Sequence, residues 1–224
     1  MSELVFASIA SLAEAVALRT VEVARAAIAQ RGRFTCALTG GSAATLVYPT
    51  LAKAELDWTK VDFFYGDERC VPWDHPDSNH RHASVALGQT GARFHPIDGT
   101  RPPEEAAADY EGRLLPLDVV HLGVGPDGHV CSLFPGHPLL AESRRRAMPI
   151  FDAPKPPPRR VTLTLPALLE ARSLWFLVAG HEKREAVREA LRSPRSSLPA
   201  ALAHRGAAQS LWFLDETAAS LLTA

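Results

Sequence analysis

The sequence predicts an α/β protein whose parallel-rich central sheet is covered by helices on both faces. Short runs of β-branched and aromatic residues alternate with amphipathic segments along most of the 224 residues, and this alternation is typical of parallel sheets. Several of the predicted strands end in glycine-containing polar loops. The length suffices for one well-cored domain, and we see no internal repeat. We therefore expect a single domain over residues 1–224.

The amino-terminal half begins with a long helix. Residues 11–31 repeat apolar side chains at intervals of three and four, with Ser11 as the expected N-cap and Gly32 as the stop. The elements expected next are a short strand within 34–42, a helix over 44–52, a strand within 61–69 ahead of Gly66, a helix over 84–91, a short strand within 93–99 and a helix over 104–115.

The carboxyl-terminal half opens with an apolar strand that starts at residue 118. The proline-rich tract 152–160 can form neither a helix nor a central strand. We interpret it as a long surface loop and not as an interdomain linker, because the alternation resumes after it. The expected elements are strands at 161–165, 173–180 and 210–215 and helices at 166–171, 181–191 and 216–222.

The overall composition excludes several classes of function. A net charge of −1 offers no electrostatic footprint for nucleic acid or an anionic membrane. No apolar run approaches the roughly 18 residues of a transmembrane helix, and Glu3 stands where a signal peptide carries positive charge. The three cysteines are far apart, which favours a reducing compartment. We expect a cytoplasmic protein that binds neither nucleic acid nor membrane.

Four of the predicted strands end in unusual polar loops, at 39–42, 66–69, 125–129 and 179–183. In a parallel sheet the carboxyl ends of the strands share one edge, and ligands bind beyond that edge. We therefore expect these four loops to converge on one site.

The loop 125–129, with the sequence GPDGH, carries Asp127 and His129. Its glycines and proline impose a tight turn. An imidazole beside a carboxylate is suited to general acid–base chemistry. The alternative is a turn aspartate next to a solvated histidine.

The other three loops favour an anion. The glycine turn TGGS (39–42) between a strand and a helix points backbone N–H groups outward, a geometry that favours phosphate. Arg69 and Lys183 follow two further strands and offer charge-assisted hydrogen bonds. The alternatives are a structural ion pair among Asp67, Glu68 and Arg69, and an ordinary solvated lysine at 183.

Two competing sites are weaker. His75, His80 and His82 with Asp74 and Asp77 supply enough ligands for a metal, but no regular spacing holds them together. Ser132 follows His129 closely, but no nucleophile elbow surrounds it. We expect no metal, no cofactor and no serine nucleophile.

Taken together, these motifs resemble the 6-phosphogluconolactonase family. The segments are TGGS, GDER, the Ser78-Asn79 pair, GVGPDGHVCSLFPGH, APKPPPRRVTLTLP and AGHEK, in the family's order from residue 39 to 183. The end of the chain, SLPAALAHRG and SLWFLDETAA, resembles the family as well. The resemblance implies a modified Rossmann-like three-layer fold, shared with glucosamine-6-phosphate deaminase and ribose-5-phosphate isomerase.

The resemblance also implies an activity and residue roles. The reaction is hydrolysis of 6-phospho-D-glucono-1,5-lactone to 6-phospho-D-gluconate, in the oxidative pentose phosphate pathway, without a metal. His129 would be the general base and Asp127 would position it. Substrate-binding residues would be Gly41, Ser42, Asp67, Arg69 and Lys183. One departure is that Ala43 and Ala44 stand where the family usually has Thr-Pro.

Two other functions stay open at this point. A sugar-phosphate isomerase or deaminase of the same fold shares the GxGxDGH loop, but deaminases continue it with Asn-Glu-Pro, where this chain has Ser-Leu-Phe-Pro. A non-catalytic sugar-phosphate sensor would carry a DNA-binding helix-turn-helix, for which this chain has no extra segment. The expected partner is a small phosphorylated sugar lactone, and the expected state is a monomer or weak homodimer.

Overall fold

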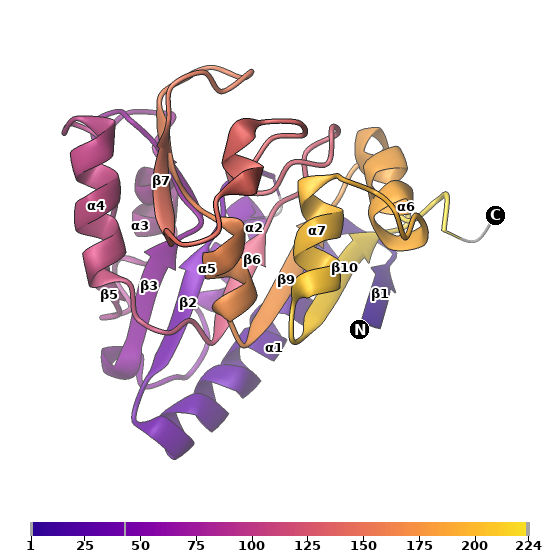
Figure 1. Ribbon diagram of the computed structural model, residues 1–224. Coiled ribbons are helices and arrows are strands. Elements are labelled where there is room, and N and C mark those ends of the chain that lie inside the picture. The colour runs from indigo at the N-terminus through magenta and orange to yellow at the C-terminus, as the bar shows by residue number, and fades with distance from the viewer. Residues whose placement is uncertain (1, 43, 223–224) are drawn as a thin grey trace.

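A computed structural model of the chain describes residues 2–42 and 44–222, and its centre is a parallel seven-stranded sheet (Figure 1). The strand order is β1-β10-β9-β6-β2-β3-β5. These strands are β1 (Ser2–Phe6), β2 (Phe34–Leu38), β3 (Val61–Tyr65), β5 (Arg93–Phe94), β6 (Val119–Leu122), β9 (Ser173–Val178) and β10 (Ser210–Asp215). A separate antiparallel sheet pairs β4 (Asp67–Arg69) with β8 (Arg160–Leu163), and β8 with β7 (Ala147–Ile150).

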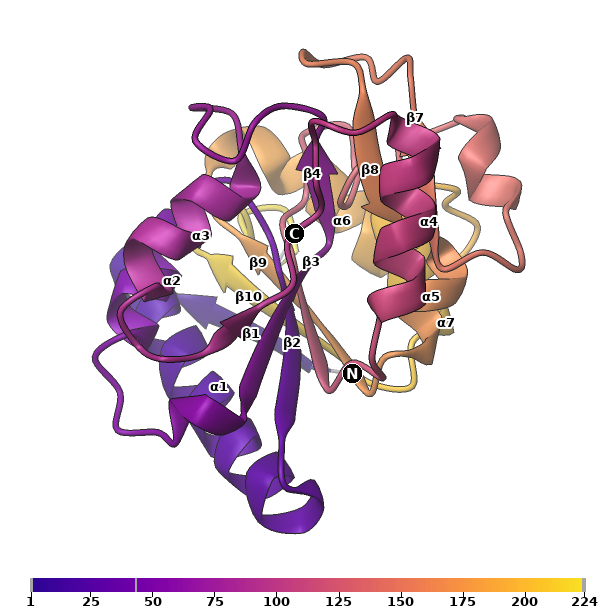
Figure 2. The same cartoon turned by 90° about the vertical axis from the view of Figure 1, so that its left-hand side faces the viewer.

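Helices and the small sheet form the outer layers. The helices are α1 (Ile9–Arg31), α2 (Ala44–Leu51), α3 (Asn79–Leu87), α4 (Pro103–Arg113), α5 (Leu165–Glu170), α6 (Arg184–Arg192) and α7 (Pro199–Gly206), with short 3₁₀ turns at 58–60, 138–141 and 181–183. Figure 2 shows α1, α2 and α3 on one face and α4, α5, α7 and the small sheet on the other. Within the described residues, no helix is long and apolar enough to cross a membrane.

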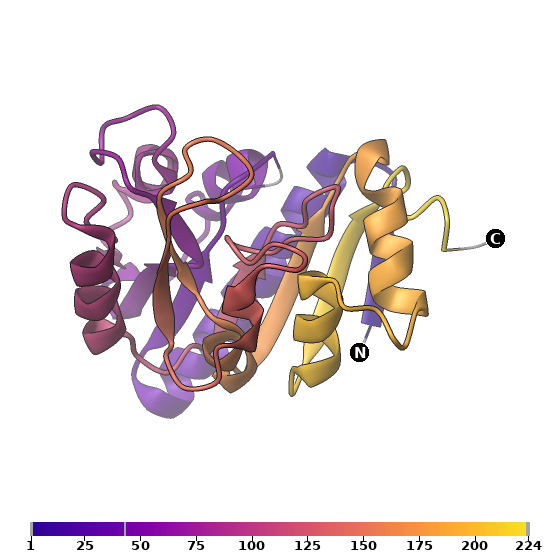
Figure 3. The same cartoon turned by 45° about the horizontal axis from the view of Figure 1, so that its top comes forward.

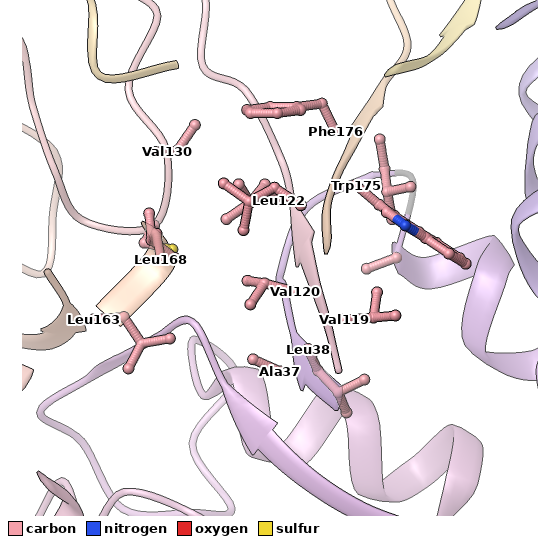
Figure 4. Close-up of a cluster of buried hydrophobic side chains, with 14 of the residues drawn as sticks. Ala37, Leu38, Val119, Val120, Leu122, Val130, Leu163, Leu168, Trp175 and Phe176 are labelled. Atoms are coloured by element: carbon pink, nitrogen blue, oxygen red, sulfur yellow. The ribbon is translucent and has the colours of Figure 1, made fainter. Parts of the chain in front are cut away.

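The hydrophobic core lies on both faces of the central sheet. On β6, Val119 points to the face that also carries Trp175 of β9, whereas Val120 and Leu122 point toward Leu163 of the small sheet (Figure 4). All five side chains are essentially inaccessible to solvent. Burial on both faces explains why these strands read as continuous apolar runs.

The predicted three-layer α/β fold is confirmed, but several elements differ in their ends. The long helix starts at Ile9, because Ser8 and not Ser11 is its N-cap and the two serines form a capping box. Helix α3 was predicted over 84–91 but runs over Asn79–Leu87, since Ser78 accepts a hydrogen bond from the Arg81 amide and starts it earlier. Pattern reading overlooked this cap within a polar stretch.

Three elements were missed and one was wrong. Strands β1 and β7 and helix α7 were not predicted; β1 is a five-residue edge strand with four exposed residues, and its apolar residues Leu4, Val5 and Phe6 show no alternation. Residues 216–222, predicted as a helix, form turns. Residues 67–69 were predicted as part of a strand-end loop, residue 160 as the end of the proline-rich loop and 161–165 as a strand of the main alternation. Instead, 67–69 and 160–163 form strands that pair with each other in the small sheet. Local periodicity cannot tell which sheet a strand joins.

Two buried tyrosines fix the ends of neighbouring strands at the edge where the loops gather. The Tyr48 hydroxyl of α2 accepts a hydrogen bond from Thr39 N (2.8 Å) and donates to Thr39 O (3.1 Å). The Tyr110 hydroxyl of α4 does the same to Tyr65 at the end of β3, at 2.7 Å for each bond. Each hydroxyl therefore satisfies an N–H and a C=O where the chain leaves a strand.

We expect Tyr110→Phe to destabilise the fold by about 1–3 kcal/mol, because it leaves two buried backbone groups of Tyr65 unpaired. Urea unfolding of the purified variant measures this change. Val85→Ala is the control, since Val85 is 79% exposed and its truncation is expected to change stability by less than about 0.5 kcal/mol. Equal midpoints for the two variants would contradict the assignment.

Candidate active site

Strands β9, β6, β2 and β3 are consecutive neighbours in the parallel sheet, so the segments that follow them meet at its carboxyl edge, which Figure 3 turns toward the viewer. A pocket opens there. Six of the seven predicted site residues line it: Gly41, Ser42, Asp67, Arg69, His129 and Lys183. The expected convergence of the four segments is confirmed, although residues 67–69 form strand β4 and not a loop.

Asp127, the seventh predicted residue, lies next to His129 and not on the pocket wall. Its Oδ1 is 2.5 Å from His129 Nδ1. The turn that joins them is closed by hydrogen bonds from Gly125 N to His129 O (3.0 Å) and from Gly128 N to Gly125 O (2.9 Å). A Cβ on Gly125 would lie 2.0 Å from His129 Nδ1 and 2.5 Å from Asp127 Oδ1. Only glycine at 125 permits this arrangement of the Asp127–His129 pair.

The hydrogen bond defines the tautomer of His129. An ionised carboxylate only accepts hydrogen bonds, so Nδ1 carries the proton and Nε2 keeps its lone pair. Burial lowers the pKa of His129, and the neighbouring Asp127 opposes that shift in part. Partial burial by itself raises the pKa of Asp127, but the hydrogen bond from His129 and the charges of His129 and Lys155 bring it below its ordinary value. The pair is therefore a neutral imidazole beside a carboxylate at neutral pH.

Asp67 and Glu68, adjacent in β4, have different environments. Asp67 accepts hydrogen bonds from Ser132 Oγ (2.6 Å) and Asn79 Nδ2 (3.1 Å). Glu68 is buried and accepts from the amides of Arg69, Asn79 and His80 and from the Ser78 hydroxyl, at 2.8–3.0 Å. Glu68 therefore anchors the start of α3, and no ion pair links it to Arg69 within the described chain, contrary to the alternative considered from sequence.

The predicted cations Arg69 and Lys183 both reach the pocket. One Arg69 nitrogen, Nη1, donates to the Asp77 carbonyl (2.5 Å), while its buried Nε has no protein partner among the described residues. Lys183 lies in the 3₁₀ turn after β9. Burial lowers the pKa of Lys183, and the nearby acids Glu182 and Asp215 offset this only in part. Half-buried cations whose charges are only partly offset by nearby acids are suited to an anionic ligand.

Sequence reasoning missed a third cation in the pocket, Arg160 at the start of β8. Its side chain is 5% exposed and its Nη1 lies 3.9 Å from Asp67 Oδ2 and 3.3 Å from Ser132 Oγ. Its guanidinium carbon also lies 5.7 Å from the Phe134 ring centre, and Phe134 packs against the His129 ring at 4.9 Å. The signal was present, since an arginine that begins a buried strand is rarely an ordinary surface residue.

The glycine turn lies at the pocket mouth. Gly41 has a φ of 90°, in the left-handed region that favours glycine. A Cβ on Gly40 would lie 2.3 Å from Asn79 Oδ1, so glycine there permits the close approach of α3. Thr39 Oγ1 accepts a hydrogen bond from Gly123 N (3.1 Å), which joins this turn to the Asp127–His129 loop. Ala43, one of the two departures from the family pattern, lies outside the described residues.

The competing sites do not assemble. His80 Nδ1 bonds the Tyr65 hydroxyl (2.6 Å) and His82 Nε2 lies 2.9 Å from the Pro76 carbonyl. His75 Nδ1 accepts from the Asp77 amide (3.1 Å). Over residues 2–42 and 44–222, no three metal-ligating side chains come together. Ser132 is fully buried and donates to Asp67, so its hydroxyl is unavailable as a nucleophile.

An acid–base pair beside three cations, at the carboxyl edge of a Rossmann-like sheet, defines a site for chemistry on a small anionic molecule. The family model for glucosamine-6-phosphate isomerases/6-phosphogluconolactonase matches residues 7–212. A 6-phosphogluconolactonase from Rattus norvegicus is 41% identical, and the match covers 96% of this chain and 89% of that one. The chain belongs to this family.

Solved structures agree with this assignment. The structure of 6-phosphogluconolactonase from Trypanosoma brucei superposes with a TM-score of 0.88 at 28% identity, covering 99% of this chain and 98% of that one. A monomeric glucosamine-6-phosphate deaminase also superposes, with a TM-score of 0.84 over 99% of this chain and all of that one, but at 20% identity. The second likeness shows the shared fold alone.

We expect Gly125→Ala to fold but to separate His129 from Asp127, because the three atoms nearest to the new methyl group all belong to the side chains of these two residues. Proton NMR of the imidazole N–H groups measures this: the resonance of the hydrogen-bonded Nδ1 proton should be lost while the melting temperature stays close to that of the parent. Gly112→Ala is the matched control, since a Cβ at Gly112 of α4 meets nothing within 4 Å. An unchanged Nδ1 resonance in Gly125→Ala would contradict the steric argument.

Proposed function

We propose that this chain hydrolyses 6-phospho-D-glucono-1,5-lactone to 6-phospho-D-gluconate, as a metal-independent carboxylic ester hydrolase of the oxidative pentose phosphate pathway. The observation that carries the proposal is the Asp127–His129 pair, which stands beside the same pocket that Arg69, Arg160 and Lys183 line. The pair supplies a base for water and the cations supply a phosphate site. Curated relatives named 6-phosphogluconolactonase support the same reaction.

In the proposed mechanism His129 is the general base. Its Nε2 takes a proton from a water molecule as that water attacks the lactone carbonyl, and the carbonyl becomes a tetrahedral oxyanion. Asp127 holds the ring through Nδ1 and stabilises the imidazolium that forms. When the intermediate collapses, the same proton moves from Nε2 to the departing ring oxygen, so the bond between that oxygen and the carbonyl carbon breaks without a covalent enzyme intermediate.

The Gly123 and Gly125 amides are not the donors to the oxyanion. Gly123 N donates to Thr39 Oγ1 and Gly125 N donates to His129 O, so these two amides are already engaged within the protein. The cations of the pocket are the other groups available to the substrate. We assign Arg69 and Lys183 to binding of the phosphate and the sugar acid. Gly41 and Ser42 line the pocket beside them. We assign Asp67 to the sugar, since hydrogen bonds from Ser132 and Asn79 orient its carboxylate oxygens.

A direct assay tests the proposal. We expect lactone decay at neutral pH, corrected for spontaneous hydrolysis, to accelerate in proportion to added protein and to be unaffected by a chelator. No acceleration would overturn the proposal, and inhibition by the chelator would overturn its metal-independent form. Release of ammonia from glucosamine 6-phosphate would instead favour the deaminase reaction.

Two substitutions separate the roles of the pocket residues. His129→Asn should lower kcat by about 10²- to 10⁴-fold with a smaller effect on KM, because it removes the base. Arg69→Ala should mainly raise KM, by about tenfold to a hundredfold, because it removes a charge-assisted hydrogen bond. Steady-state kinetics measures both, with Arg19→Ala as the control, since Arg19 is an exposed residue of α1 that pairs with Glu22. Near-normal turnover by His129→Asn would exclude the mechanism.

The pH dependence follows from the protonation state of His129. Neutral imidazole is the active form, and burial holds the pKa of His129 below its usual 6.5. The value of kcat/KM should therefore stay constant through neutral pH and fall only as the pH drops through that lowered pKa. A profile of kcat/KM against pH measures the midpoint, and a midpoint above 6.5 would contradict the assignment of His129 as the buried base.

We infer a cytoplasmic protein that acts as a monomer or weak homodimer on a small phosphorylated lactone. The three cysteines support the location, since Cys36, Cys70 and Cys131 are all unpaired and Cys36 and Cys131 are buried, as in a reducing compartment. Light scattering at working concentration measures the assembly.

A further inference from the structure

One cation near the Asp127–His129 pair has no part in the reaction as proposed. Lys155 belongs to the segment 151–159, which joins β7 to β8. Its Nζ lies 3.7 Å from Asp127 Oδ1, the same oxygen that is 2.5 Å from His129 Nδ1. An ammonium and an imidazole thus share one carboxylate oxygen. Lys155 is not among the residues that line the pocket, and this shared carboxylate oxygen is its contact with the acid–base pair.

The backbone around Lys155 is firmly held. Arg160 Nη2 donates to the Lys155 carbonyl (2.9 Å) and to the Pro156 carbonyl (3.3 Å), and Arg160 Nε donates to the Pro157 carbonyl (2.9 Å). At the other side of the segment, Ala153 N donates to Pro158 O (3.1 Å). An ordinary surface lysine lacks such backbone support, and an ion pair that it forms adds little to stability. Here a buried arginine fixes the residue from which the ammonium extends.

We propose that Lys155 is a positioning residue of the hydrolysis, which draws the Asp127 carboxylate toward its own ammonium and so keeps His129 in the neutral form that accepts a proton. The inference rests on the proposed function, in which His129 is the base. It extends the active site to the proline-rich segment, which supplies neither a residue of the acid–base pair nor one of the residues assigned to the phosphate.

The charges that face His129 give the direction of the effect. Asp127 on its own loop and Asp67 on β4 favour the imidazolium, whereas Lys155 disfavours it. Arg69, Arg160 and Lys183 line the same pocket from β4, β8 and the turn after β9. Loss of the Lys155 charge should raise the pKa of His129. Activity should then be lost at a higher pH as the solution is acidified, with little change on the alkaline side.

The test compares Lys155→Met, Lys155→Arg and the parent in two measurements: the pH profile of kcat/KM for the lactone, and the NMR titration of the His129 ring protons. We expect Lys155→Met to move both midpoints upward by about 0.2–0.7 pH unit, the size of a partly exposed ion pair. Lys155→Arg should restore the parent values because it keeps the charge. Lys60→Met is the matched control, since Lys60 precedes β3 at the opposite edge of the sheet.

The two measurements fail separately. If the parent protein does not hydrolyse the lactone, the proposed function is wrong, yet the titration of His129 still reports whether Lys155 acts on it. If the parent is active and the midpoints of Lys155→Met match those of the parent, or if Lys60→Met shifts them equally, the role of Lys155 is overturned. A shift in Lys155→Arg as large as that in Lys155→Met would also overturn it, because the charge would then be irrelevant.

Discussion

Asp67 connects four segments of the chain. From β4 it accepts hydrogen bonds from Ser132, after β6, and from Asn79 at the start of α3, and it lies 3.9 Å from Arg160 of β8. Asp67 and Arg160 are both buried, and removal of one partner from such a pair leaves an uncompensated charge. Asp67 therefore joins β4, α3 and β8 around the pocket, together with Glu68 at the start of α3, and this arrangement depends on β4 leaving the main sheet at Gly66.

The small antiparallel sheet explains how a parallel fold acquires the rest of its site. The central sheet alone brings the glycine turn, the Asp127–His129 loop and Lys183 to one edge, because β2, β6 and β9 are parallel neighbours. The pairing of β4 with β8 then adds Arg69 and Arg160 above that edge and sets the direction of the proline-rich segment. Burial lowers the pKa of both Arg160 and Lys183, and an anion in the pocket would offset the cost of desolvating them.

Much of the fold and most of the site could be predicted from sequence because the signals are local. Val119 and Val120 predict a buried strand, and the glycines after them predict the turn that carries His129. Arg160 begins a buried strand, which marks it as an unusual arginine, but the sequence does not show that β8 pairs with β4 beside the pocket. Its place in the pocket depends on a contact with Ser132, which is 28 residues away in sequence. Ser132 in turn bonds Asp67, which is a further 65 residues away. Strand β1 was missed for a related reason: it pairs only with β10 and is mostly exposed.

The sequence by itself determined the alternation of strands and helices, the one edge where polar loops meet, and the imidazole, carboxylate and cationic side chains at that edge. These follow from periodicity and from turn chemistry, which act over a few residues. Only the tertiary structure decided that Glu68 anchors α3 while Asp67 faces the pocket, that Arg160 joins the site, and that Lys155 reaches Asp127. Those outcomes depend on pairing between strands distant in sequence, where hydrogen bonds and burial of charge select one arrangement that no local pattern encodes.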